Sequence, residues 1–535
     1  MNKKEFCGIC LIMISMNSTS TTMTIEELQN RCAQLEQENA ELTNKVNWLM
    51  EQFRLSQSQR FGRSSEKVAD GQQTLFDIFN EAEAEAKPDA PEPTMETITY
   101  KRKKQQGHRE AVLADLPVET IDYRLSEEEQ ICRQCGGRQH EMSTETRREI
   151  KIIPTQVKVV EHVRHIYGCR NCERNEINTP IVTAPAPTPV IPGSIASPSA
   201  VAHIMNGKYT DCLPLYRQEQ QLERLGVELS RQTMANWMIY ASDRWLTPIY
   251  DRLHELLLEQ DILMADETTL QVLHEEGRKA ENKSYIWLYR SGRYGPSIVL
   301  YEYQPTRAGK HPQKFLAGFK GYLQIDGYPG YNGLEDVILC GCWSHAKREF
   351  TDALKALPAG KSPTTTVAGE GLAFCNQLFA IERDLHDLTP EERHTKRLEI
   401  SRPVLDAFAE WLRFQMPRVL PKSALGEAIR YCRNQWDKLE NFLLNGRLEI
   451  SNNRSERSIK PFVMGRKNWL FSNTPRGAKA SATIYSIIET AKENGLIPFQ
   501  YLTYLFERMP NLGNGSLDEL LPWSASLPDY CKMPK

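Results

Sequence analysis

Four of the 13 cysteines stand in two closely spaced pairs, Cys132-x-x-Cys135 and Cys169-x-x-Cys172. A tetrahedral zinc ion takes four such ligands, and each C-x-x-C turn supplies two thiolates. Four cysteine ligands leave no open coordination position, so the ion would support the fold rather than take part in a reaction. The spacing therefore predicts one structural Zn²⁺ bound by Cys132, Cys135, Cys169 and Cys172.

Two aspartates follow apolar runs that are typical of buried strands. Asp266 comes directly after residues 262–265, and Asp326 closes the run Gly-Tyr-Leu-Gln-Ile-Asp that begins at residue 321. Further strands are expected at 270–273, 285–289, 298–303 and 337–343. Three antiparallel strands, a crossover helix and a parallel strand are the order of an RNase H-like fold, in which adjacent strands place two aspartates side by side. One Asp at a strand end is commonly only a helix cap, but two in this order favour a paired acidic site.

A basic segment lies between residues 447 and 479, where eight Lys and Arg occur against two Glu. Trp469 and Phe471 lie among these cations. Cations interleaved with aromatic residues favour contact with a nucleic-acid backbone and with unstacked bases. The candidate DNA-binding residues are Arg457, Lys460, Arg466, Lys467, Trp469 and Arg476.

Glu456 is an acid inside this basic segment, on a helix that residues 451–453 are expected to cap. Its setting allows two interpretations, a neutralised ion pair or a metal ligand. Pro461 predicts that the helix ends or kinks right after Lys460, which would keep Glu456 near a helix end. Glu489, in the apolar-periodic segment 484–494, competes with it as a third functional acid and has an alternative role as a partly buried structural residue.

The elements that must position these groups begin with a leucine repeat near the N-terminus. Leucines recur every seven residues, with a polar residue at one of the intervening core positions; the residues concerned are Leu28, Leu35, Leu42, Leu49 and Asn39. This spacing is typical of a short parallel coiled coil, and a core asparagine fixes the register and favours two strands. The alternative is one amphipathic helix packed against its own domain.

The chain as a whole reads as a multidomain α+β protein. We expect an N-terminal coiled coil, a four-cysteine zinc-binding module, a helical DNA-binding region resembling a helix-turn-helix, and an RNase H-like α/β core with a helical insertion. The expected boundaries are 1–23 for a mis-start or inert extension, 24–56 for the coiled coil, 57–107 for a basic and acidic linker, 108–183 for the zinc module, 184–260 for the helical region, 261–495 for the core with its insertion at about 352–445, and 496–535 for a C-terminal element.

Length and composition narrow the class of protein. The 535 residues carry a net charge of −3, with 40% hydrophobic and 25% charged residues. These values exclude a disordered or collagen-like chain and leave enough apolar mass for several cores. The apolar run at 6–16 follows Lys3 and Lys4 and superficially resembles an export signal, but an inert extension is favoured. No stretch approaches 18 apolar residues, so no membrane association is expected.

The strings ADETTLQVL, YLQIDGYPGYNGL, GCWSHAKREF and SNNRSERSIKPFVMGRKNWLF, the last followed by RGAKASATIYSIIETAKENG, resemble the insertion-sequence-66 family of bacterial transposases. The likeness runs from about residue 24 to the end of the chain. It departs from the family pattern at Ser451, where an acid is expected, and in the additional first 23 residues.

The resemblance implies a DDE transposase whose catalytic acids are Asp266, Asp326 and Glu456. Three such carboxylates would hold two Mg²⁺ (or Mn²⁺) ions per active site, chemically independent of the zinc. It further implies double-stranded DNA as partner, both the terminal inverted repeats of the element and the target. A homo-oligomer of at least two chains, small accessory proteins of the same element and a cytoplasmic, nucleoid-associated location complete the expectation.

Two other classes of function fit the same residues. One is a zinc-ribbon DNA-binding regulator whose core has lost catalysis. The other is an RNase H-fold nuclease that cuts DNA without joining it. Metal-dependent cleavage would separate the transposase from the first class, and strand-transfer products would separate it from the second.

Overall fold

The computed structural model describes residues 25–61, 156–168, 181–358, 365–513 and 515–534. These residues fall into two compact units. The helical unit comprises Met1–Ile78 and Cys340–Ser451, and the sheet unit comprises Phe79–Leu339 and Asn452–Lys535. Among the described residues, no helix combines the length and the apolar composition that crossing a membrane requires.

The sheet unit is built on a mixed five-stranded sheet with the order β5-β4-β3-β6-β7. Its strands are β3 (Ile262–Gln271), β4 (Lys283–Ser291), β5 (Val299–Gln304), β6 (Gly321–Gln324) and β7 (Val337–Cys340). Strands β3, β4 and β5 pair antiparallel, whereas β6 runs parallel to β3. Aromatic and β-branched residues are frequent in β4 and β5, and β4 is buried on both faces from Ile286 to Ser291.

Strand β3 differs from the sequence expectation in its length. The sequence predicts a strand that stops before Asp266 and another at 270–273, but β3 continues through Asp266 to Gln271. The reason is that β4 pairs with it along its whole length, from Leu263↔Ser291 to Gln271↔Lys283. Asp266 therefore lies within a strand rather than at the end of one.

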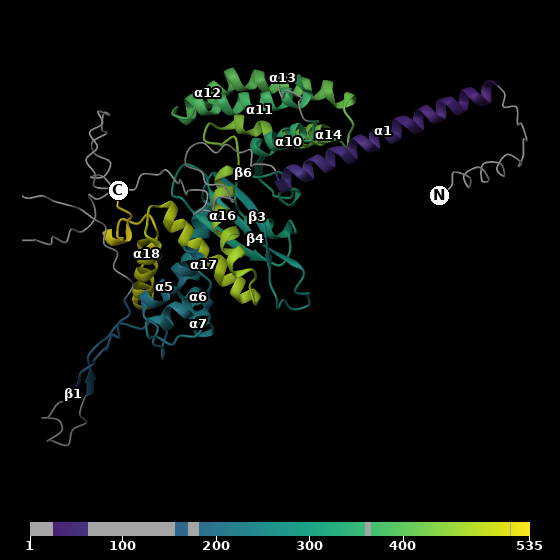
Figure 1. Ribbon diagram of the computed structural model, residues 1–535. Helices are drawn as coiled ribbons and strands as arrows, with labels where there is room; N and C mark the ends of the chain where they lie inside the picture. The colour runs from purple at the N-terminus through teal and green to yellow at the C-terminus, as the bar shows by residue number, and fades with distance from the viewer. Residues whose placement is uncertain (1–24, 62–155, 169–180, 359–364, 514, 535) are drawn as a thin grey trace, which may run out of the picture. The chain divides into compact units, whose positions relative to one another are not determined.

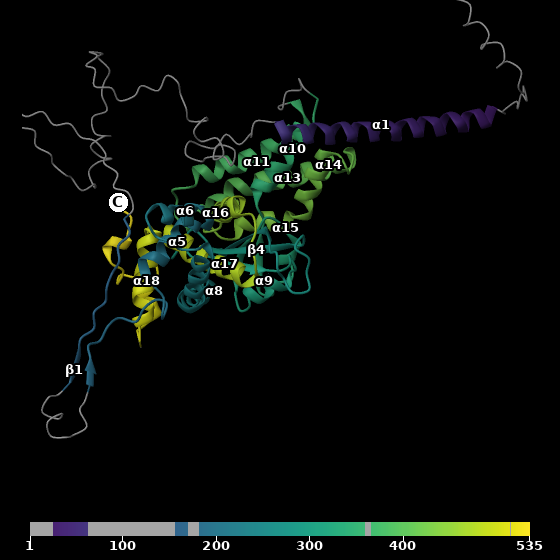
Figure 2. The ribbon, with the colours of Figure 1, turned by 60° about the horizontal axis from the view of Figure 1, so that its bottom comes forward.

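Two long helices cover one face of this sheet. Helix α16 (Asn453–Trp469) packs on β3 and β4, and α17 (Pro475–Glu493) packs on β5; they run beside the strands in both views (Figures 1 and 2). Ser486 and Thr490 of α17 accept hydrogen bonds from the β5 amides of Tyr301 and Val299, at 2.8 and 3.0 Å. Such small polar residues allow the helix to approach the edge strand closely.

The sequence predicts that the helix ends or kinks after Lys460. Helix α16 passes through Pro461 and ends at Trp469, so it does not end there, and Glu456 lies in its first turn. Proline removes one hydrogen bond, to the carbonyl of Arg457, and this residue is exposed to solvent. On either side of Pro461, Ile459 and Phe462 are buried in the core. Packing of these apolar side chains offsets the missing bond.

The remaining elements of the sheet unit surround this core. A helical cluster precedes the sheet and one helix follows α17: α5 (Pro198–Tyr209), α6 (Leu215–Arg224), α7 (Arg231–Ala241), the π-helix η1 (Ser242–Leu246), α8 (Thr247–Leu258) and α18 (Pro498–Arg508). Between α6 and α7, Gly226 takes a positive φ of 81° and the Ser230 hydroxyl caps the Thr233 amide. The short pieces are β1 (Ile166–Gly168), β2 (Ile181–Thr183), α9 (Lys310–Phe315), η2 (Pro329–Tyr331), η7 (Met509–Asn511), η8 (Leu517–Leu520) and η9 (Asp529–Cys531).

The helical unit combines α1 (Ile25–Phe61) with a bundle formed by residues after β7. The bundle consists of α10 (Trp343–Lys355), α11 (Val367–Asp384), α12 (Pro390–Lys396), η4 (Arg397–Ser401), α13 (Arg402–Gln415), η5 (Met416–Arg418), α14 (Ala424–Asn434), α15 (Trp436–Leu439) and η6 (Glu440–Leu444). Its core is aromatic, with Trp343, Phe350 and Phe408 packed together. The C-terminal part of α1 is fixed to this bundle, since Arg54 donates to the Ala356 carbonyl at 3.2 Å and Glu51 accepts from the Ala424 amide at 3.1 Å.

Candidate active site

Asp266 lies in the middle of β3, on the central strand of the sheet. Its carboxylate Oδ1 accepts a hydrogen bond from the Glu267 amide at 2.8 Å. Burial raises the pKa of Asp266 well above its usual range, and the negative charges of Glu267, Asp326 and Glu456 raise it further, against the opposing effect of the amide. The aspartate is thus half-buried and within electrostatic reach of three other acids.

Asp326 follows β6, the parallel neighbour of β3. The register pairs Ile262 with Tyr322 and Met264 with Gln324. Asp266 and Asp326 each come two residues after this last pair, so they lie opposite one another. Neighbouring strands lie about 4.8 Å apart, which brings the two aspartates to adjacent positions. The Tyr328 amide donates to Asp326 Oδ1 at 3.0 Å, which fixes the carboxylate in the turn that follows the strand.

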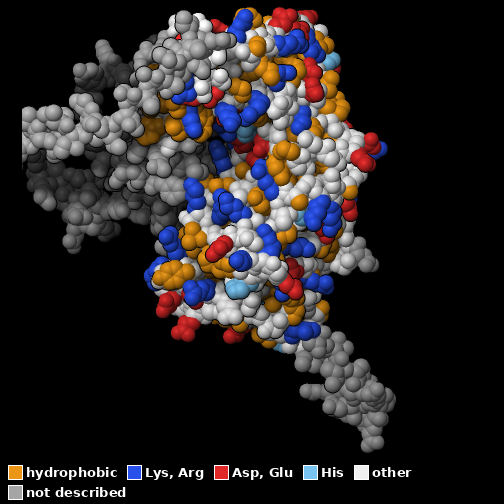
Figure 3. All heavy atoms as spheres, turned by 90° about the vertical axis from the view of Figure 1, so that its right-hand side faces the viewer, with side chains coloured by type: hydrophobic (Ala, Val, Ile, Leu, Met, Phe, Trp, Pro, Cys, Tyr) orange, Lys and Arg blue, Asp and Glu red, His pale blue; other side chains and the backbone are white. Residues whose placement is uncertain are grey.

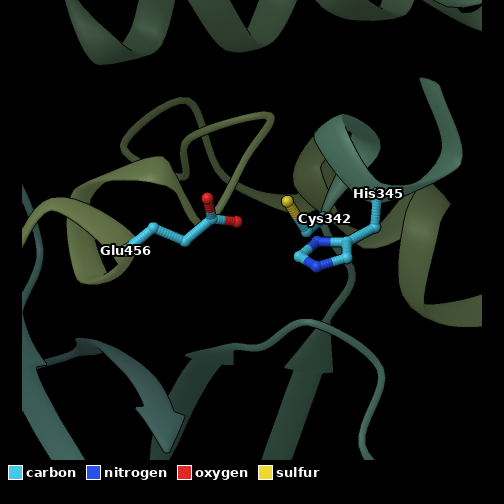
Figure 4. Close-up of side chains that lie close together, drawn as sticks. All are labelled: Cys342, His345 and Glu456. Carbon is cyan, nitrogen blue, oxygen red and sulfur yellow. The ribbon is translucent and has the colours of Figure 1, made fainter. Parts of the chain in front are cut away.

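Glu456 projects from the first turn of α16 (Figure 4). The start of this helix is tied to β3, because the Asn452 side-chain amide donates to the Ala265 carbonyl at 2.8 Å, next to Asp266. The structure therefore brings together the three acids expected from the sequence: Asp266 and Asp326 on adjacent strands, and Glu456 near enough to raise the pKa of Asp266. All three belong to the sheet unit.

Three carboxylates in one place repel one another when they are ionised. A divalent cation would offset this repulsion, and carboxylate oxygens are the ligands preferred by Mg²⁺ and Mn²⁺. The residues present therefore fit such an ion. A divalent ion held in this way can assist phosphoryl transfer.

Residues that the sequence did not single out surround the two aspartates. Glu267, whose side chain is buried, pairs with Arg307 and accepts from the Tyr331 hydroxyl at 2.8 Å. The Arg307 guanidinium lies 3.7 Å from the centre of the Tyr328 ring, and the Tyr328 hydroxyl donates to the Arg307 carbonyl. This network connects the neighbour of Asp266 with the turn that holds Asp326. Arg307 carries no local motif, so the sequence offers no signal for it.

A second buried arginine fixes the two covering helices. Arg290, paired with Met264 across β3 and β4, donates to Glu493 of α17 at 3.1 and 3.2 Å and also to the Ser458 hydroxyl of α16. Since it contacts both helices, Arg290 sets the position of α16, and hence of Glu456, on the sheet.

Glu489, the competing acid, lies in a different environment on α17. It is buried and pairs with Lys492 at 2.8 Å. Burial raises its pKa, while the nearby Lys492 ammonium lowers it. Glu456, by contrast, is among the charges that raise the pKa of Asp266.

The residues of the basic segment have unequal exposure. Arg457, Lys460 and Lys467 are exposed on α16, and Lys and Arg side chains are prominent on the face drawn in Figure 3. Arg466, Trp469 and Arg476 make contacts within the protein. Arg466 donates to Thr268 Oγ1 at 3.2 Å and to Thr269, and its burial lowers its pKa. The Trp469 ring packs on Phe462, with centroids 5.6 Å apart, and Arg476 pairs with Asp243 at 2.9 Å.

The other predicted sites lie partly outside the described residues. Cys132, Cys135, Cys169 and Cys172 all fall in undescribed segments. On α1, Leu35, Asn39, Leu42 and Leu49 are exposed, and Leu28 is part of the same helix. In the helical unit, Cys342 and His345 lie together at the start of α10 (Figure 4), with Sγ and a ring nitrogen within 4.8 Å.

Four models of known families match the chain. Residues 193–480 match the model described as "Transposase IS66 family", and residues 129–173 match the zinc-finger binding domain of transposase IS66. Residues 486–523 match the IS66 C-terminal element, and residues 48–121 match a model described as "Transposase C of IS166 homeodomain". The zinc-finger match includes all four cysteines of the two C-x-x-C pairs.

Similar proteins occur in Sinorhizobium fredii. Three of them, y4jD, y4hP and y4qI, carry the description "uncharacterized protein". The protein y4jD is 29% identical over 473 residues, which cover 85% of this chain and 89% of the relative. The proteins y4hP and y4qI are 31% and 32% identical, covering 73% and 74% of both chains.

Proposed function

The chain belongs to the IS66 family of transposases, and from this premise we propose that it binds the terminal inverted repeats of its insertion sequence, cleaves the DNA there and joins the freed 3′-hydroxyl ends to target DNA. The observation that carries the proposal is the level placement of Asp266 and Asp326 on parallel strands, with Glu456 within electrostatic reach. Family membership alone gives the class of protein, a transposase. The cluster of Asp266, Asp326 and Glu456 supports the proposed cleavage and joining of DNA.

The sheet supports assignment of the core to the RNase H-like class. In chain order, the first three strands of the sheet are antiparallel neighbours, and the fourth lies parallel to the first on its other side. An aspartate on the first strand and one after the fourth are then neighbours by topology. Helix α16 supplies the third acid from later in the chain.

In this mechanism the carboxylate oxygens of Asp266, Asp326 and Glu456 would hold two Mg²⁺ ions. When bound, such ions would lower the pKa of the attacking water or hydroxyl and would stabilise negative charge on the leaving oxygen. Water attacks the phosphorus at the end of the element, and the P–O3′ bond breaks. The attacking water loses one proton, and the released O3′ gains one. The new 3′-hydroxyl then attacks the phosphorus of a target phosphodiester. A P–O3′ bond to the element end forms and the target's own P–O3′ bond breaks, so the proton lost by the attacking hydroxyl is matched by one gained at the released target 3′-oxygen. No side chain acts as a covalent nucleophile.

The neighbouring residues hold this cluster in shape. Arg307, Glu267 and Tyr331 restrain the turn after β6, and Arg290 restrains α16. The exposed cations Arg457, Lys460 and Lys467 follow Glu456 on the same helix and would contact DNA phosphates. The zinc module would act apart from the acids, as a support for recognition of the DNA ends.

We also propose that two chains pair through α1. The exposed leucine face of α1 supports pairing of two chains, since two element ends must be held together for joining. Small accessory proteins of the same element would complete the machinery, and the reaction would take place on the bacterial nucleoid in the cytoplasm. We assign residues 24–56 to pairing, 108–183 to zinc binding, 184–260 to DNA contact and 261–495 to catalysis, with the helical insertion at about 352–445.

Cleavage of DNA that carries the element's own ends tests the function directly. With Mg²⁺ present, the full chain should release labelled 3′-hydroxyl ends and join them to a second duplex. Asp266→Asn and Asp326→Asn should each lower both rates by about a thousandfold or more, because each removes a metal ligand. Binding of the same DNA should change little. Asp251→Asn, at an exposed aspartate of α8, is the matched control and should stay fully active.

Other outcomes would assign a different class. Specific binding with no Mg²⁺-dependent cleavage would indicate a DNA-binding regulator. Cleavage that never yields joined products would indicate a nuclease. Strand transfer retained at more than a few per cent in Asp266→Asn or Asp326→Asn would remove that residue from the metal site.

A further inference from the structure

The link between α16 and α17 begins with an unusual turn. The Phe471 amide donates to the Trp469 carbonyl at 2.8 Å, which closes a three-residue γ-turn centred on Leu470. Leu470 has φ 65° and ψ −48°, the rare and strained form of this turn. A bulky residue with positive φ is a conformational outlier, and such strain is concentrated at functional sites.

The two side chains after Trp469 are apolar and exposed. Leu470 is 65% exposed and Phe471 is 43% exposed, although both lie next to a tryptophan that packs inward on Phe462. Single exposed apolar residues are ordinary, but two adjacent ones on a strained turn form a projecting apolar tip. We name Leu470 and Phe471 the apolar tip.

A rigid base supports this tip. The Ser472 amide donates to the Gln271 carbonyl at 3.0 Å, and the Leu273 amide donates to the Ser472 carbonyl at 3.0 Å. The His274 amide donates in turn to the Asn473 carbonyl at 3.0 Å. The segment that follows the tip is therefore bonded to the C-terminal end of β3, the strand that also carries Asp266.

The charge around the tip favours a polyanion. From residue 457 to residue 479 the chain has six Lys and Arg and no Asp or Glu. Lys467 is exposed before the tip. After it, Arg476 and Lys479 are exposed and line an open pocket that also includes Asp243, with which Arg476 pairs. Cations on both sides of an apolar projection match a DNA strand, whose phosphates flank the bases.

We propose that Leu470 and Phe471 form a wedge that enters an unstacked base step of the DNA end bound for cleavage. The proposal rests on the proposed function. Architectural DNA-binding proteins insert leucine and phenylalanine between base steps in this manner, and the exposed face of Phe471 can stack on a base. This assigns base contact to Phe471 and Leu470, and leaves Trp469 to support the turn from within.

The position of the wedge relative to the acids can be bounded. Five residues separate Asp266 from Gln271, and an extended strand rises about 3.3 Å per residue, which gives about 17 Å. This is the distance from Asp266 to the base of the tip, and with base pairs about 3.4 Å apart it corresponds to the length of about five base pairs.

Fluorescence of 2-aminopurine tests the wedge, because this base analogue brightens when it is unstacked. A set of duplexes carries the element end, with the analogue at each position within about six base pairs of the cleavage point. The full wild-type chain should raise the fluorescence severalfold at one or two adjacent positions. Phe471→Ala and Leu470→Gly should abolish this rise and weaken binding by about tenfold or more. An abasic site at the same step should restore most of the lost affinity, because the unstacking is then already complete.

Matched variants separate the wedge from a folding defect. Ile195→Ala, at an isoleucine of the same unit that is 84% exposed, should leave the fluorescence rise intact. Leu470→Gly suits the positive φ, so its melting temperature should equal or exceed that of the wild type while the signal is lost. Phe471→Tyr should retain the signal.

Three results would overturn the wedge, and they bear differently on the proposed function. If the wild-type chain binds and cleaves the ends without brightening any position, the wedge is wrong and the proposed function stands. If the chain neither binds the ends specifically nor cleaves them, both fail together. An unchanged signal in Phe471→Ala and Leu470→Gly also rejects the wedge.

Discussion

Glu456 and Glu489 lie in different surroundings, and we expect their roles to differ accordingly. Glu456 begins a helix that is tied to the strand of Asp266, whereas Glu489 is buried on α17 beside Lys492. We expect Glu456→Gln to abolish Mg²⁺-dependent cleavage without unfolding the chain, since the amide keeps the shape but loses the charged ligand. Glu489→Gln should retain cleavage and change mainly the stability. End cleavage and thermal melting of both variants are the measurements. An active Glu456→Gln protein beside a folded, inactive Glu489→Gln protein would reverse the assignment.

Glu302 predicts a pH dependence of stability. Burial raises its pKa to about 7, against a hydrogen bond from Gln304 and the charge of Lys314. The unfolded chain loses this proton near the ordinary glutamate pKa of about 4.3, so between these values the folded state holds one more proton. The free energy of unfolding therefore decreases as pH rises through this window, by up to about 3 kcal/mol.

Substitution of Glu302 isolates this effect. Denaturant unfolding at pH 5 and pH 8 should show Glu302→Gln gaining stability relative to the wild type as pH rises, because the variant has no proton to lose. Glu276→Gln, at an exposed glutamate of the same unit, should show no such gain. Equal changes in the wild type and in Glu302→Gln would mean that Glu302 is ionised in the folded chain.

At the scale of elements, local patterns predict more than long-range contacts. Strands β4 and β5 were predictable because aromatic and β-branched residues cluster there, and Asp326 because an apolar run ends in it. The full length of β3 could not be predicted from the sequence. Its polar residues 266–269 are typical of a turn, and only their pairing with β4 makes them part of a strand. The continuation of α16 through Pro461 depends likewise on burial of Ile459 and Phe462.

The residues that surround the candidate site could not be predicted from the sequence, for the same reason. Arg307 lies 40 residues from Glu267, and Arg290 lies 203 residues from Glu493, so no spacing connects the partners. The basic segment was visible as a segment, but its pattern does not distinguish Arg466 and Trp469, which contact protein, from Lys460 and Lys467, which are exposed.

The zinc module gives a prediction for a whole element. The family match at 129–173 covers Cys132, Cys135, Cys169 and Cys172. Cys169→Ser should reduce bound zinc from about one ion per chain to almost none, because a three-thiolate site binds zinc far more weakly. Specific binding of the DNA ends should be lost with local unfolding. Metal analysis of purified protein measures this, with Cys212→Ser as a control that should keep its zinc. Folded wild-type protein without zinc would reject the site.

At the scale of the molecule, catalysis and pairing are assigned to different units. The three acids lie in the sheet unit, whereas α1 belongs to the helical unit, to which Glu51 and Arg54 attach it. Leu35, Leu42 and Leu49 lie before this attachment, and their side chains are exposed. Damage to the leucine face should therefore leave the acids and the attached end of α1 unchanged.

This separation yields a prediction about assembly. The double variant Leu35→Glu, Leu42→Glu places charges in the apolar seam, so it should dissociate a dimer at least about a hundredfold more readily. Glutamate at Ala33 and Ala40, which face away from the seam in the same heptads, should leave the dimer intact. Sedimentation of each full-length chain at micromolar concentration measures the assembly. The seam variant should still bind one end and hydrolyse it, but should no longer join two ends together. If it sediments like the wild type, α1 does not pair the chains, and its exposed leucines require another partner.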